Sequence, residues 1–194
     1  MGVKFLSQHG FPSLLYDTLF GLILFFGLDS FLEIRDGAHF AFYGFATIII
    51  IHWWLMFKAA DDIFTPGVRD TAVHIAVNIL YVILLEFMSL HAASFRYVEA
   101  TSFLILVLLL DILWAAIVLR AGRWKRAPTE KAAMMRTELK AIIRVNGMLV
   151  LLLAFLAAMA GALSPAAFVA IFIVDYLAFI ILTFKEKIID LPAF

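Results

Sequence analysis

The stretch LYDTLFGLILFF, residues 15–26, begins a long apolar segment and carries a carboxylate, Asp17, inside its first turn. The chain around it is 65% hydrophobic and 15% charged, with a mean hydropathy of +1.04. Soluble domains carry about 45–50% apolar and about 25% charged residues, and a water-soluble core cannot accommodate so large an apolar excess. The stretch therefore indicates a membrane-spanning helix, and the predicted fold class is an all-α, polytopic membrane helix bundle.

A spanning helix needs about 20 mostly apolar residues, and six segments of the chain have this length. We expect spans at 13–34, 37–58, 71–92, 97–120, 140–162 and 165–187, within a single integral-membrane domain over 1–194. The connections contain charges, Gly and Pro, and Pro165 suits the first turn of the last helix. The first apolar run is too long for the core of a signal peptide, so we interpret it as a retained span.

The distribution of Lys and Arg predicts the orientation of the helices. With six spans, 13 of the 15 basic residues fall on the side that holds both termini, and only Arg35 and Arg96 lie on the other side. Because basic residues favour the cytoplasmic side, both termini should be cytoplasmic, and we expect a multi-pass protein of the cell (cytoplasmic) membrane. The basic connection at 120–131 either fixes this topology alone or also contacts anionic lipid headgroups.

Acidic side chains outnumber fixed cations at membrane depth. Charges in hydrocarbon are costly, and those present usually face a bundle interior or a wet cavity. The acids within or at the edges of the spans are Asp17, Asp29, Glu86, Glu99, Asp111 and Asp175, whereas the only comparable cation is Arg144. This excess predicts either neutral, protonated carboxyls or a mobile cation as their partner.

Polar and aromatic side chains near the inner ends of the spans form a predicted helix-clamp network. Its members are Asp17, His52, Trp53, His74, Asn78 and Arg144. Asp17 is predicted to pair with Arg144. It is also expected to bond to His52, to His74 or to an indole of the Trp53–Trp54 pair, which would hold the first helix in place. Two interpretations stay open: a purely structural clamp, or an Asp placed at the mouth of a pore.

Three further acids are predicted intramembrane acids, namely Glu86, Asp111 and Asp175, and Glu86 is expected in the outer part of its span. Asp111 and Asp175 fall nearest the middle of their spans. The structural interpretation is a protonated acid that bonds to a neighbouring backbone carbonyl. The functional interpretation is proton exchange in a proton-coupled secondary transporter.

In the first helix, Asp17 is followed by the aromatic Phe20, the small Gly21 and the aliphatic Leu22. This arrangement resembles the first helix of the transmembrane protein 175 family of potassium channels. Asp17 matches the Asp of the family's Arg-x-x-x-Phe-Ser-Asp signature, Phe20 matches the aromatic residue three positions on, and Gly21 the small residue after it. Leu22 falls where the family places a large aliphatic pore constriction. The plan of six spans, with Trp near the inner end of the second helix and a Pro that opens the sixth, is also similar.

The resemblance implies a homo-oligomer in which copies of the first helix surround a path for monovalent cations. The pore and gate residues would be a stripe along one helix face: Thr18, Leu22, Phe26 and Asp29. Leu22 and Phe26 would gate by dewetting, and Asp29 would concentrate cations at the outer mouth. The chain departs from the signature at Phe11, Leu15 and Tyr16, which stand in place of its Arg, Phe and Ser.

A non-catalytic accessory subunit of a larger membrane complex, with or without haem or quinone, is a third alternative. Two haems in one bundle need His pairs that share a helix face. His39 and His52 differ by about 220° in azimuth, and His74 and His91 by about 260°, so two haems are not expected. A single haem between His52 and His74 stays open.

Catalysis is not expected from this chain. There is no Cys, and the sequence lacks the HExxH, GxSxG and phosphate-loop motifs of hydrolases and nucleotide enzymes. We therefore predict no enzyme activity, no catalytic residue, no bound metal and no cofactor. The partners expected are monovalent cations, the lipid bilayer and further copies of the chain, with no nucleic acid.

Overall fold

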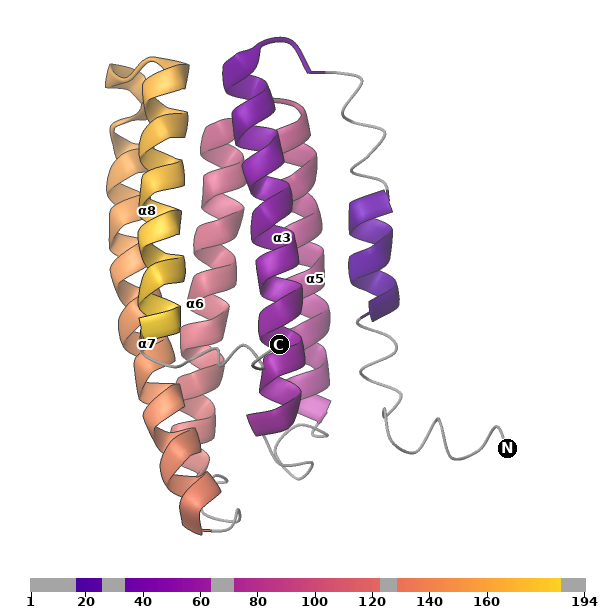
Figure 1. Ribbon diagram of the computed structural model, residues 1–194, viewed down its shortest axis with the longest axis vertical. Coiled ribbons are helices and arrows are strands. Elements are labelled where there is room, and N and C mark those ends of the chain that lie inside the picture. Colours follow the sequence, from indigo (N-terminus) through magenta and orange to yellow (C-terminus); the bar gives the residue numbers. More distant parts are fainter. Residues whose placement is uncertain (1–16, 26–33, 64–71, 123–128, 186–194) are drawn as a thin grey trace.

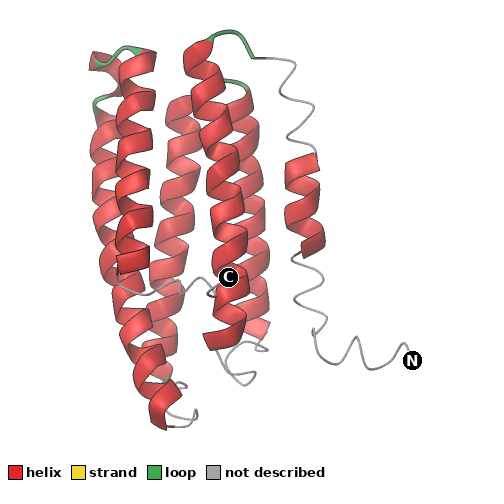
Figure 2. Ribbon diagram, in the orientation of Figure 1, coloured by secondary structure: helices red, strands yellow, loops and turns green. Residues whose placement is uncertain are grey.

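The computed structural model describes residues 17–25, 34–63, 72–122 and 129–185. All the long described elements are helices, and they run up and down side by side (Figures 1 and 2). They are a helix over 17–25, α3 (Gly37–Ile63), α5 (Ala72–Ala93), α6 (Tyr97–Ala121), α7 (Thr129–Ala158) and α8 (Pro165–Lys185), with a single 3₁₀ turn at Ala160–Ala162.

The five long helices form a closed ring. Each helix from α3 to α8 packs against the next one along the chain, and α8 returns to pack against α3. The helix over 17–25 stands outside this ring, beside α3 and α5 (Figure 1). The ring is therefore a self-contained bundle to which the first helix is added at the periphery.

All five ring helices are long and apolar enough to cross a membrane. This confirms the prediction of an all-α, multi-pass membrane protein. The first predicted span, 13–34, lies partly outside the described residues, of which 17–25 are helical. The count of six spans and the cytoplasmic placement of both termini stay predictions.

The ends of the helices follow from local chemistry. The Asp36 side chain accepts a hydrogen bond from the His39 backbone N–H at 2.8 Å, which caps the start of α3. The Ser164 hydroxyl caps α8 in the same way through Ala167, directly before Pro165, as the sequence predicts. Gly122 ends α6 with a left-handed φ of 62°, a conformation that glycine adopts without strain.

The helix α7 extends beyond its predicted membrane span on the N-terminal side. The predicted span began at 140, whereas α7 begins at Thr129 and continues as one helix to Ala158. A hydropathy criterion misses residues 129–139 because they are polar. They are nevertheless rich in Ala, Glu, Lys and Met, which are strong helix formers, so the helix extends beyond its apolar part.

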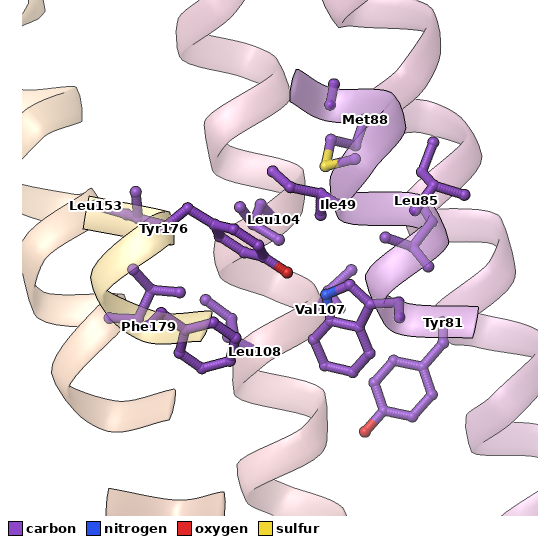
Figure 3. Packing of buried hydrophobic residues seen from close by; sticks show 14 of the residues in the cluster. Ile49, Tyr81, Leu85, Met88, Leu104, Val107, Leu108, Leu153, Tyr176 and Phe179 are labelled. Carbon is purple, nitrogen blue, oxygen red and sulfur yellow. The ribbon is translucent and has the colours of Figure 1, made fainter. Parts of the chain in front are cut away.

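Large apolar side chains fill the centre of the ring. Figure 3 shows side chains from α3, α5, α6, α7 and α8 that converge on this centre, among them Ile49, Leu85, Leu104, Val107 and Leu153. Each of these five is completely buried. The described bundle is therefore packed along its axis like a protein core.

Candidate functional site

The helix over 17–25 has one face attached to the bundle and one face turned away from it. Phe20 and Ile23 are buried, with exposed fractions of 2% and 4%. In addition, the Trp54 indole Nε1 of α3 donates a hydrogen bond to Asp17 Oδ1 at 2.9 Å. This bond is the indole contact expected for Asp17, and it explains why an apolar helix keeps an acid in its first turn.

The opposite face of this helix is exposed. Thr18, Gly21, Leu22 and Phe25 all lie on it, with Leu22 44% and Phe25 63% exposed. The described half of the predicted pore stripe, Thr18 and Leu22, thus points away from the bundle. The other half, Phe26 and Asp29, lies outside the described residues.

The predicted helix-clamp network divides into separate parts. Trp54 contacts Asp17 in the way expected, His52 bonds to Tyr176 instead, and the His74 side chain lies outside the described residues. Arg144 is exposed on α7, and Figure 1 places α7 on the far side of the bundle from helix 17–25. The expected Asp17–Arg144 pair is therefore wrong: the ring separates the two helices.

Asp111 of α6 is the centre of a buried polar cluster. Its Oδ1 accepts a hydrogen bond from the Tyr81 hydroxyl of α5 at 2.8 Å, and its Oδ2 accepts one from Asn146 Nδ2 of α7 at 2.6 Å. Asp111, Tyr81 and Asn146 are all buried. The expected backbone-carbonyl partner is thus replaced by two neutral side-chain donors, which join three helices at one carboxyl group.

A second polar contact closes the ring between α3 and α8. His52 Nδ1 and the Tyr176 hydroxyl lie 2.9 Å apart, and the His52 ring packs edge-on against Tyr176 and Phe179. The other ring nitrogen, His52 Nε2, is buried and has no hydrogen-bond partner among the described residues. This pair satisfies one nitrogen of His52 inside the bundle, far from the Asp17 side of α3.

These contacts lie in one layer across the bundle. At about 1.5 Å per residue, all five polar side chains lie about 16–22 Å from the helix ends near Gly37, Ala93, Tyr97, Ala158 and Pro165. The Trp53 ring of α3 packs on the Tyr81 ring, with centroids 5.6 Å apart. Asn78, three residues before Tyr81, is buried on α5 as well. Every ring helix thus contributes polar atoms to the middle of the membrane.

Glu86 of α5 and Asp175 of α8 differ from Asp111, because both are partly exposed. Neither carboxyl makes a hydrogen bond or ion pair to another described residue. Phe172 and Phe179, which flank Asp175 on its helix face, pack against rings of α3. Asp175 therefore lies at the edge of the α3–α8 contact, where its carboxyl reaches the outer surface.

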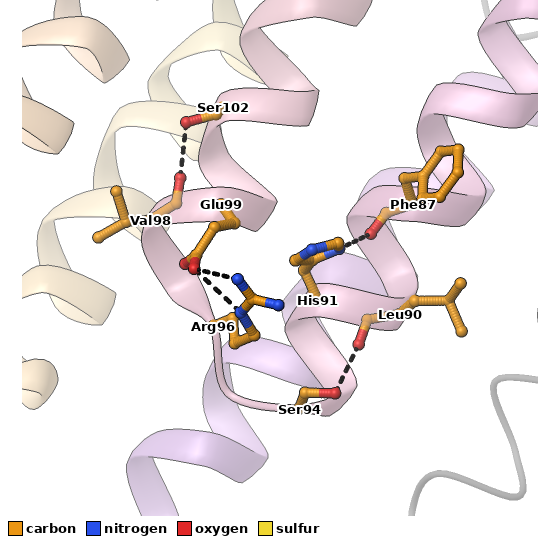
Figure 4. Close-up of polar contacts among 8 residues, drawn as sticks. All are labelled: Phe87, Leu90, His91, Ser94, Arg96, Val98, Glu99 and Ser102. Carbon is orange, nitrogen blue, oxygen red and sulfur yellow. Dashed lines mark hydrogen bonds and ion pairs between the residues drawn. The ribbon is translucent and has the colours of Figure 1, made fainter.

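The turn between α5 and α6 is held by polar contacts at the other end of the bundle. His39 Nε2 lies 2.8 Å from the Ala93 carbonyl, and the His39 ring stacks on Phe95 at 4.9 Å. Because His39 Nδ1 accepts the Arg35 backbone N–H, Nε2 is the nitrogen that donates to Ala93. In Figure 4, Arg96 forms an ion pair with Glu99 at 2.7 Å, so Glu99 is an interfacial acid with its own cation.

Sequence reasoning missed the two tyrosines that complete the buried contacts. Tyr81 and Tyr176 lie in the middle of their spans, although tyrosine in membrane helices is enriched at the interfaces. A buried tyrosine hydroxyl needs a polar partner. A tyrosine far from either membrane surface was thus a signal for a buried polar partner, such as Asp111 or His52.

No family model, curated protein or solved structure matches the chain.

The Tyr81–Asp111 hydrogen bond should be measurable as a coupling free energy between the two residues in a double-mutant cycle. Tyr81→Phe removes the donor and leaves a buried carboxylate oxygen without its partner, so we expect the folded state to lose about 1–2 kcal/mol. Reversible unfolding in mixed micelles measures this loss, and the effect should shrink when Asp111→Asn is already present. Tyr97→Phe is the matched control, because the Tyr97 ring packs on Phe168 and its hydroxyl bonds to no described residue. Equal losses for both variants would contradict the assignment.

The Asp17–Trp54 bond should hold helix 17–25 against α3. In Trp54→Phe the ring remains but the donor is lost, and we expect a cysteine placed at the buried Ile23 to react with a maleimide about tenfold faster. The natural chain contains no Cys, so the label reports on this position alone. A cysteine at exposed Thr18 should react equally fast in both backgrounds. An unchanged rate at position 23 would show that the bond does not anchor the helix.

Proposed function

We propose that the chain is a subunit of an oligomeric cation channel, in which copies of the first helix line the path for monovalent cations. One observation carries the proposal: helix 17–25 is anchored by Asp17, Phe20 and Ile23 and turns Thr18 and Leu22 away from its own bundle. In an oligomer, this outward face is available for contact with a second copy of the chain.

The packed centre of the five-helix ring supports a path between subunits. Leu104, Val107 and Leu153 are completely buried there, and the two polar contacts are enclosed by aromatic side chains. An ion that crossed this centre would have to displace close-packed side chains, which is costly. The described part of the chain thus favours a route along the periphery, where helix 17–25 stands.

The resemblance of residues 17–22 to the potassium channel family supports the same assignment. There, Leu22 corresponds to the constriction of the pore, and an aliphatic ring at a constriction gates by excluding water. The Trp54 bond gives Asp17 the role of an anchor rather than that of an ion ligand. Potassium as the ion, the homo-oligomer and the pore itself belong to this proposal.

A flux assay on reconstituted liposomes tests the channel. Leu22→Ala should raise K⁺ flux by about tenfold, the effect of lowering the barrier at the constriction by about 1.4 kcal/mol. Leu151→Ala on α7 is the matched control, because Leu151 is 72% exposed and carries no assigned role. It should leave the flux unchanged. Zero flux of K⁺ and Na⁺ in the wild type and in both variants would eliminate the channel.

A proton-coupled transporter is the second candidate, and one observation favours it. Glu86 and Asp175 lie within apolar spans, partly exposed, and neither bonds to a described residue. A carboxyl without a protein partner in the membrane is able to take up and release a proton with little rearrangement. Asp111 differs from these two acids, because both its oxygens accept hydrogen bonds from donors inside the bundle.

The rate of proton movement across the membrane of liposomes with an imposed pH or potassium gradient distinguishes the two candidates. Under the transporter hypothesis, Asp175→Asn should abolish proton-coupled transport, since the amide cannot release a proton. Glu99→Gln, which changes an acid already paired with Arg96 at the membrane edge, should retain it. Transport that survives Asp175→Asn would leave the channel as the better description.

A further inference from the structure

A row of cations runs along the outer surface of α7. Arg136, Lys140 and Arg144 are spaced four residues apart, so their side chains lie along one ridge of the helix, with each about 6 Å from the next one along the helix axis. All three side chains are exposed. The acid on the same stretch, Glu138, is buried on the other face of the helix and does not belong to the ridge.

The same ridge faces lipid further along the helix. Continuing in steps of four, it passes through Met148 and Leu152, which are 51% and 45% exposed. Exposed apolar side chains on a membrane-spanning helix contact acyl chains. The ridge thus changes from apolar to cationic between Met148 and Arg144, without turning toward the bundle.

The depth of the three cations brackets the membrane surface. Measured from Ala158 at about 1.5 Å per residue, Arg144 lies about 21 Å along α7, Lys140 about 27 Å and Arg136 about 33 Å. The hydrocarbon core is about 30 Å thick. With Ala158 at the far edge of the core, the Arg144 and Lys140 backbones lie inside it and Arg136 lies at its surface. The long side chains of Arg144 and Lys140 then extend toward the surface near Arg136.

We propose that Arg136, Lys140 and Arg144 form a binding site for the phosphate of an anionic phospholipid in the leaflet at the Thr129 end of α7. A guanidinium binds phosphate through two parallel hydrogen bonds, and an ammonium adds a point charge. Arg136 and Arg144 also interact within the chain, and the five N–H donors of each guanidinium leave further donors for the lipid.

Native mass spectrometry of the purified protein with mixed phosphatidylglycerol and phosphatidylcholine tests the site. The wild type should retain phosphatidylglycerol in preference to phosphatidylcholine. Each single substitution, such as Arg144→Gln, should weaken this retention about fivefold, and Arg136→Gln with Lys140→Gln and Arg144→Gln together about a hundredfold. Substituting Lys for both arginines keeps the charge and should retain most of the preference, which separates lost binding from lost folding.

Arg120→Gln is the matched control, because Arg120 is an exposed cation near the same end of the neighbouring α6. It should change lipid retention less than twofold. An equal loss in Arg120→Gln and Arg144→Gln would mean that the overall positive charge attracts the lipid, and would overturn the site. Displacement of the lipid by millimolar inorganic phosphate or glycerol phosphate would assign the site to free phosphate instead. A triple variant that keeps its lipid preference would also overturn the proposal.

Discussion

The carboxyl group of Asp111 constrains the whole bundle. In a membrane, lipid is as apolar as the helix surfaces, so apolar burial alone does not select which helices meet. A carboxylate away from water must find donors, and Asp111 finds one on α5 and one on α7. Satisfying this single group fixes the rotation and the depth of three consecutive helices. The His52–Tyr176 contact does the same for α3 and α8, and the ring closes.

The sequence alone predicts the architecture well. The starts of α3, α6 and α8 agree with the predicted spans, because apolar runs are interrupted by charges, Gly or Pro at these places. The helix α7 begins before its predicted span, at Thr129, because its first turns are polar although their residues favour helix. The side-chain contacts were less predictable. The indole bond of Asp17 follows from its predicted depth near the Trp53–Trp54 pair. Arg144 was predicted at a similar depth, but α7 lies on the opposite side of the ring from helix 17–25. Depth in the membrane does not tell on which side of the bundle a residue lies.

The described structure separates two kinds of acid. Asp17, Glu99 and Asp111 have protein partners of three different chemistries: an indole, a guanidinium and a pair of neutral donors. These acids stabilise the fold, so the excess of acids in the composition overstates the need for mobile cations. Glu86 and Asp175 make no hydrogen bond or ion pair to another described residue. Any account of transport by this chain has to explain them or the outward face of helix 17–25.

The short turn between α5 and α6 has a consequence for biogenesis. Phe95 adopts a left-handed backbone with a φ of 57°, and this reversal lets Ala93 and Tyr97 belong to two antiparallel helices. So tight a reversal leaves no length for one helix to cross the bilayer before the other. α5 and α6 should therefore insert together as a helical hairpin, whose tip is contacted by His39 of α3.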